Sequence, residues 1–268
     1  MSAGSLTFRN RSRLRPITDG LSDILAVAGR NLLTYVRVPQ LLVFSTIQPV
    51  IFVLLFRYAF GGAVRVPTGN YVDYLMPGIF VQTTVFGAIG TAIGLSTDLQ
   101  TGLLERFRSL PMSRAAVLAG RTLAELARNA LVVLLMVAVG FAVGFRVHTG
   151  VLPFIVAMGV VLIVGYVFCW VFASVGLMTN DPESAQAAAF PVLALLVFAS
   201  SAFVPTSTMP DWLRLYAEHQ PVSAAITAVR TLVLGGSGLV PTLKALAWMA
   251  GILAVFAPVS IWRYQRTT

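Results

Sequence analysis

The feature that most constrains the fold is a set of long runs without a charged residue. No Asp, Glu, Lys or Arg occurs from Thr149 to Asn180, from Tyr74 to Thr97, or from Val38 to Phe56. A helix needs about 20 apolar residues to cross the hydrocarbon core of a bilayer. Charged residues make up only 11% of the chain, against about 25% in soluble domains. The sequence therefore predicts an integral membrane protein.

The expected fold class is all-α, with six transmembrane helices. The predicted transmembrane domain covers 40–263; it follows a cytoplasmic basic tail and interfacial amphipathic helix in 1–39, and 264–268 form a cytoplasmic tail. Prolines and glycines divide 205–238 into pieces too short to span, which predicts short external re-entrant helices there. The six spans are expected at about 40–60, 71–97, 120–144, 151–178, 184–204 and 241–262.

The basic residues indicate the orientation of the chain. A formal charge of +9 would suggest nucleic-acid binding in a soluble domain. Here the arginines flank the apolar runs, and those assigned to the inner side outnumber those assigned to the outer side, as the positive-inside rule requires. We therefore expect both termini in the cytoplasm, membrane lipids as partners, and no nucleic acid.

Residues that catalysis, metal binding or nucleotide binding would need are missing from the sequence. The chain has one cysteine, Cys169, and neither a P-loop motif nor a GxSxG motif. A lipid-modifying intramembrane enzyme, the alternative from another class, would need a buried nucleophile, base or metal set. We therefore expect no enzyme activity, no metal and no cofactor bound to this chain, and any transport would be driven from elsewhere.

A dense charged segment, 98–119, separates the second and third predicted spans. Its leucines and its phenylalanine recur at helix-like intervals among acidic and basic residues, and Pro111 interrupts the pattern. Such a short amphipathic helix between spans suits a docking site for a soluble partner. The alternative is a cytoplasmic loop whose arginines only fix the topology.

Three charged residues begin the third predicted span. Arg121, Glu125 and Arg128 are spaced i, i+4 and i+7, so they share one helical face. Charges within a span usually face the bundle or pair with one another. Because the glutamate can pair with either arginine, the spacing favours an intramembrane clamp over a proton relay.

Two long segments carry a family resemblance. LLERFRSLPMSRAAVLAGR, at 103–121, resembles the loop between the second and third spans of type-two ABC transporter permeases, in particular the daunorubicin- and doxorubicin-resistance-like branch. The segment from NDPESAQ at 180 to LVLGG at 236 is similar to the fifth span and external helices of the same branch. One difference is Gln220-Pro221, where many members of the branch have Asn-Pro.

The resemblance implies a permease subunit in the bacterial cytoplasmic membrane. Such a subunit pairs with a second copy or a sister permease and with two separate ABC ATPase subunits, which would bind ATP and Mg²⁺. The expected function is export of an amphipathic drug, lipid or glycolipid. A polysaccharide or lipid-linked glycan exporter of the same architecture is the alternative.

The resemblance also assigns roles to residues. Coupling to the ATPase would involve Leu104, Glu105, Arg106, Phe107, Arg108 and Arg114. The external gate would include Trp212, Tyr216 and Pro221. A cargo path between two permeases would mix aromatic side chains with two amides, although ordinary helix packing is the alternative for each of them: Phe44, Gln48, Phe52, Gln82, Phe86, Phe190 and Phe198.

Overall fold

The structure is a computed structural model that describes residues 17–38, 40–62, 64, 66, 70–103, 114–179 and 181–266. Within these ranges every regular element is a helix, which confirms the all-α prediction. In chain order the elements are α1 (Ile17–Arg37), α2 (Gln40–Leu55) with its π-helical continuation η1 (Phe56–Phe60), α3 (Tyr71–Gly87), α4 (Ile89–Gln100), α6 (Arg114–Val143), α7 (Val151–Gly176), α8 (Pro182–Phe198), the short η2 (Thr206–Thr208), α9 (Asp211–His219), α10 (Pro221–Leu234) and α11 (Leu239–Arg266).

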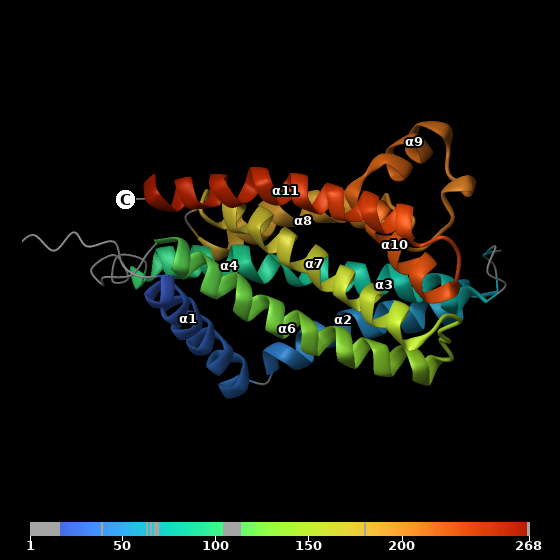
Figure 1. The fold of residues 1–268 in the computed structure, drawn as a ribbon, viewed down its shortest axis with the longest axis horizontal. Helices are drawn as coiled ribbons and strands as arrows, with labels where there is room; N and C mark the ends of the chain where they lie inside the picture. The colour runs from blue at the N-terminus through green and yellow to red at the C-terminus, as the bar shows by residue number, and fades with distance from the viewer. Residues whose placement is uncertain are drawn as a thin grey trace, which may run out of the picture.

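Four helices of the described chain are long and apolar enough to cross a membrane: Tyr71–Gln100, which combines α3 and α4, Val117–Val143, Val151–Gly176 and Leu239–Arg266. Three shorter apolar helices accompany them, at Ser45–Phe60, Pro182–Phe198 and Pro221–Leu234. The helices are arranged lengthwise in a bundle, with α1 packed obliquely against α6 (Figure 1).

Polar side chains cap the starts of two helices, α3 and α8. The side chain of Asn70 accepts a hydrogen bond from the Val72 amide at 3.2 Å and caps α3. At α8, the Asp181 carboxylate accepts bonds from the backbone N and the hydroxyl of Ser184, at 2.8 and 2.7 Å. These bonds hold the pKa of Asp181 below its usual value. Pro182 occupies the first turn of α8, where no amide hydrogen is needed.

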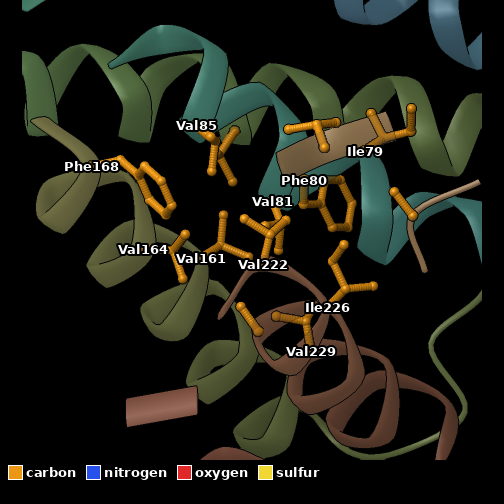
Figure 2. Packing of buried hydrophobic residues seen from close by; sticks show 14 of the residues in the cluster. Ile79, Phe80, Val81, Val85, Val161, Val164, Phe168, Val222, Ile226 and Val229 are labelled. Atoms are coloured by element: carbon orange, nitrogen blue, oxygen red, sulfur yellow. The ribbon is translucent and has the colours of Figure 1, made fainter. Parts of the chain in front are cut away.

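The hydrophobic core is built around α3, α7 and α10. Buried valines, isoleucines and phenylalanines from these helices interdigitate, including Ile79 and Phe80 of α3, Val164 of α7, and Val222 and Ile226 of α10 (Figure 2). Residues Tyr71 to Val85 of α3 are all buried, so α3 is the central element.

Two glycines allow unusually close contact between helices and neighbouring backbone. A Cβ atom at Gly176 of α7 would lie 2.8 Å from Ala92 Cα on α4, and a Cβ at Gly78 of α3 would lie 2.8 Å from Ala202 Cα. Small residues at such crossings let helices in a bilayer approach to backbone contact. These two positions therefore set the spacing of α7 and α4, and of α3 and the turn after α8.

The fifth predicted span, 184–204, differs from the structure at its end. Helix α8 ends at Phe198, and 199–204 form turns and bends. The reason lies in α10: Gln220 Nε2 donates to Ala199 O at 2.8 Å, and Ser201 N donates to Ser223 Oγ at 3.1 Å. Side chains at the start of α10 thus take over backbone groups that a longer α8 would have used.

The two helices predicted within 205–238 have contrasting surroundings. Helix α9 projects from one end of the bundle and exposes most of its residues (Figure 1). Helix α10 instead packs against α3, α7 and α11, and eight of its residues are buried. The short length of α10 was visible in the sequence, but its central position was not.

The loop between α6 and α7 ties together the ends of α3 and α10. Arg146 N donates to Asp73 Oδ1 at 2.9 Å, so the loop is bonded to the first turn of α3. Two residues later, His148 N donates to Val233 O at 2.9 Å, and Thr149 Oγ1 donates to Leu232 O at 2.7 Å, near the end of α10. The opposite end of the bundle holds the end of α4, the start of α6 and the C-terminal end of α11 (Figure 1).

Candidate functional site

A cavity of about 460 Å³ lies between α2, the α3–α4 pair, α6 and α8. We call it the central cavity. Its lining combines aromatic, amide, hydroxyl and charged side chains: Ser45, Gln48, Pro49, Gln82, Thr83, Phe86, Gly87, Ile89, Gly90, Ile93, Arg128, Asn129, Val132, Gln186 and Phe190. Burying amide and charged groups within a membrane bundle is energetically unfavourable. Their presence here therefore marks a place where a polar ligand could be held.

The structure brings four of the seven predicted path residues to the central cavity: Gln48, Gln82, Phe86 and Phe190. Phe198 is linked to them, because its ring centroid lies 6.4 Å from that of Phe86. Phe52 lies 6.0 Å from Phe198, also centroid to centroid. Phe44 belongs to α2.

Aromatic rings continue from the cavity along α2 and α8. Phe198 stacks with Phe203 at 5.6 Å, and Phe203 stacks with Phe56 at 4.4 Å between centroids. Sequence reasoning missed Phe56 and Phe203. Phe56 could have been found, because it follows Phe52 by one helical turn, whereas the position of Phe203 depends on the turn after α8.

Arg128 of α6 also lines the central cavity, and its guanidinium has three neighbouring partners. Its Nε lies 2.8 Å from Glu125 Oε2, and its Nη2 donates to Gly87 O at 2.7 Å and to Asn129 Oδ1 at 3.1 Å. The Gly87 carbonyl is available because the helix tightens at Ala88: the Thr91 amide bonds to Ala88 O at 3.0 Å. The break between α3 and α4 therefore creates the acceptor that fixes this arginine.

Gln82 of α3 lines the same cavity and is only 2% exposed. Its Oε1 is buried and has no hydrogen-bond donor within the described ranges of the chain. Buried polar atoms in folded proteins are nearly always paired. An unpaired amide oxygen beside a cavity is the type of group that a bound polar ligand can satisfy.

A second cavity, of about 640 Å³, adjoins the central one and shares Gly90, Ile93 and Arg128 with it. We call it the charged cavity, because its lining also includes Arg30 of α1, Asp98 and Glu125. Arg121 lines it too and forms an ion pair with Asp98. Of the predicted trio, Arg128 thus pairs with Glu125, while Arg121 reaches across to α4.

Glycines of α3 and α4 make room for these charges. A Cβ atom at Gly87 would lie 2.8 Å from Arg128 Nη2, and one at Gly90 would lie 3.4 Å from the Glu125 carboxylate oxygens. A Cβ at Gly94 would overlap the Arg121 guanidinium. The three glycines of α3 and α4 therefore lie opposite the three charged side chains of α6, one glycine for each.

The remaining predicted site residues lie elsewhere. Leu104, Glu105, Arg106, Phe107 and Arg108 fall outside the described residues, and Arg114 begins α6. On α9, Trp212 is 74% exposed and Tyr216 is 36% exposed, and Pro221 begins α10. Among the residues that the structure describes, no three His, Cys, Asp or Glu side chains gather where they could hold a metal.

Comparison with known proteins decides the family. The ABC-2 type transporter family model matches residues 22–234, a range that contains the lining residues named for the two cavities. The chain belongs to the ABC-2 type transporter family. It is therefore a membrane-embedded permease subunit and not itself an enzyme. Permeases of this family normally work with ATPase subunits.

Among the relatives of this permease is the daunorubicin resistance ABC transporter permease protein DrrB1 of Streptomyces coeruleorubidus. The two chains are 35% identical over 245 residues, which is 91% of this chain and 87% of the relative. The probable doxorubicin resistance ABC transporter permease protein DrrC of Mycobacterium tuberculosis is 29% identical over 92% of this chain and 90% of its own length. A putative transport permease of Pyropia yezoensis is 27% identical over 79% and 74% of the two chains.

Proposed function

We propose that this permease carries an amphipathic drug, lipid or glycolipid out of the cytoplasm, driven by ATP hydrolysis in a separate subunit. The observation that carries this proposal is the composition of the central cavity. Its lining combines the aromatic rings of Phe86 and Phe190, whose centroids lie 6.4 Å apart, with polar side chains from three helices, Gln48, Gln82 and Arg128. Pockets for drug-sized ligands typically measure about 300–1,000 Å³, with apolar walls and a few placed polar groups. The relatives named for daunorubicin and doxorubicin resistance support an amphipathic cargo.

The proposal includes a topology. The α2–η1 helix and α8 join the four longer helices as spans, giving six, with both termini on the cytoplasmic side of a bacterial cytoplasmic membrane. An even number of spans agrees with the placement of the end of α4, the start of α6 and the C-terminal end of α11 at one end of the bundle (Figure 1). Helix α9 would then lie at the outer surface, where its exposed Trp212 suits the interface.

The working complex would contain two permeases and two ATPase subunits. ATP and Mg²⁺ would bind to the ATPase subunits, and the segment 98–119 would dock on them. The central cavity would open toward the second permease through α2 and α8, because Gln48 and Phe190 are both exposed in the single chain. Trp212, Tyr216 and Pro221 would belong to the outer gate.

Transport of daunorubicin in membrane vesicles that contain the permease and its ATPase tests the cargo site. Gln82→Leu keeps the packing volume but removes the amide, and Phe190→Ala removes one aromatic wall. Each is expected to raise the half-saturating daunorubicin concentration about five-fold, as for a loss of about 1 kcal/mol of binding. Leu195→Ala is the matched control, because Leu195 is exposed on α8 and lies outside the central cavity.

If both cavity variants transport daunorubicin like Leu195→Ala, the central cavity is not its binding site. If the unmodified complex moves no amphipathic drug but does move a lipid-linked glycan, the cargo class is wrong while the permease assignment stands.

A further inference from the structure

A third cavity lies at the α9 end of the bundle and shares no lining residue with the other two. It has a volume of about 500 Å³ and is bordered by α3, α9, α10, α11 and the turn after α8. We call it the end cavity. Its place in the fold separates it from the proposed cargo site, so its own lining decides which ligand it can hold.

Arg230 of α10 is the central group of the end cavity. Its Cζ lies 3.7 Å from the ring centroid of Tyr74, close enough for a cation–π contact. Its Nε and Nη2 donate to Tyr74 O at 3.3 and 3.1 Å, and Nη2 also donates to Ser201 O at 2.8 Å. These contacts orient the guanidinium but supply no negative charge.

Arg230 has more donors than these bonds use. A guanidinium has five N–H donors, and the bonds to Tyr74 O and Ser201 O use those of Nε and Nη2. No Asp or Glu pairs with Arg230 in the described part of the chain. Burial lowers the pKa of Arg230 from its usual value. A partly buried cation without an acidic partner among the described residues is stabilised by an added anion.

Two further groups make the end cavity suitable for an anion. Lys244 of α11 adds a second cation to the lining, and within the described ranges it forms no ion pair. Glu218 is the one acidic residue of this lining, so one positive charge is in excess. Ser201 is only 6% exposed, and its Oγ has no partner among the described residues. A hydroxyl of this kind can donate to an anionic oxygen.

We propose that the end cavity binds the phosphate group of an anionic phospholipid. A phosphodiester carries one negative charge, which balances the excess of the lining, and its oxygens match the donors of Arg230, Lys244 and Ser201. A lipid fits better than free phosphate because the same cavity has apolar walls at Val240 and Pro241. The adjoining α9 exposes Trp212 and Leu215, the residue types found at the level of lipid headgroups.

Retention of lipid by the purified full-length permease tests the site. The protein is reconstituted in nanodiscs of phosphatidylcholine with a minor share of phosphatidylglycerol, then transferred to mild detergent. Phosphatidylglycerol that stays bound is counted by native mass spectrometry. Lys244→Gln is expected to lower this retention about five-fold, the effect of one basic residue near a membrane surface. Lys244→Arg keeps the charge and should retain the lipid.

Arg214→Gln is the matched control. Arg214 is an exposed arginine of α9 at the same end of the molecule, but it pairs with Asp211 at 3.0 Å and does not line the end cavity. Equal retention by the wild-type protein and Lys244→Gln overturns the proposal. So does a loss in Arg214→Gln as large as that in Lys244→Gln, because the effect would then be one of surface charge.

A thermal unfolding measurement separates the two sources of phosphate. In phosphatidylcholine nanodiscs, phosphatidylglycerol is expected to raise the unfolding temperature of the wild-type protein, and millimolar inorganic phosphate is expected to leave it unchanged. An equal rise with inorganic phosphate would contradict the lipid assignment and indicate a site for free anions. None of these readouts requires the ATPase or a cargo, so they are independent of the transport proposal.

Discussion

Single residues of this permease show which interactions the sequence could reveal. The spacing of Arg121, Glu125 and Arg128 predicted that these charges share a face and that the glutamate has an arginine within reach. The bond from Arg128 to Gly87 O could not be predicted, because it depends on the local tightening of the backbone at Ala88. Nor could the ion pair of Arg121 with Asp98, because these residues lie on different helices.

The Glu125–Arg128 pair gives a prediction about stability. Both side chains are buried, at 3% and 7% exposure. Arg128→Met would leave the glutamate buried without this partner, and we expect a loss of about 3 kcal/mol of folding stability. The double variant Glu125→Leu with Arg128→Met removes both charges and should recover most of the loss. Thermal unfolding in detergent measures the stability of the single and the double variant. A double variant as unstable as the single one would show that the pair is not the cause.

At the scale of helices, the uncharged runs predicted where most elements lie. Helix α7, at Val151–Gly176, corresponds closely to the span expected at 151–178, because charged or turn-forming residues bound that run on both sides. Packing partners were harder to foresee. Prolines and glycines in 205–238 predicted a short external re-entrant helix at α10, yet its Val222, Ile226 and Val229 complete the core between α3 and α7 (Figure 2).

Two glycines of α7 provide a matched test of helix packing. Gly176→Ala would place a methyl group 2.8 Å from Ala92 Cα, against backbone that cannot rotate away. We expect a loss of about 1–3 kcal/mol, the usual cost of overpacking. Gly159→Ala is the control, because no heavy atom lies within 4 Å of the added Cβ, and it should keep or slightly raise stability. Equal unfolding temperatures for the two variants would argue against close contact of α7 with α4.

For the whole molecule, the sequence was most informative about the class of protein. Composition and uncharged runs predicted a membrane bundle, and two degenerate motifs predicted the family that the comparison then confirmed. The candidate site was harder to predict, because it is assembled from α2, α3, α4, α6 and α8. The sequence of each helix alone does not show which of the others it contacts. Only the aromatic and amide residue types indicated which positions to consider.

Coupling to the ATPase is a prediction about the assembled complex. Glu105→Ala combined with Arg108→Ala removes two charges from the proposed docking segment. We expect normal expression and folding but at least a ten-fold loss of transport, on the order of the 1–3 kcal/mol typical of coupling between sites, while the ATPase still hydrolyses ATP. Vesicle transport and phosphate release are measured in the same preparation. Unchanged transport would remove the coupling role.

The α6–α7 loop has a mechanical consequence. Because the same short loop is bonded to the first turn of α3 and to the last turn of α10, neither helix end can shift alone without breaking those bonds. A displacement of α10 would therefore pull α3 along, and α3 carries Gln82 and Phe86 into the middle of the bundle. The loop end of the bundle and the interior around Gln82 and Phe86 would therefore be displaced together.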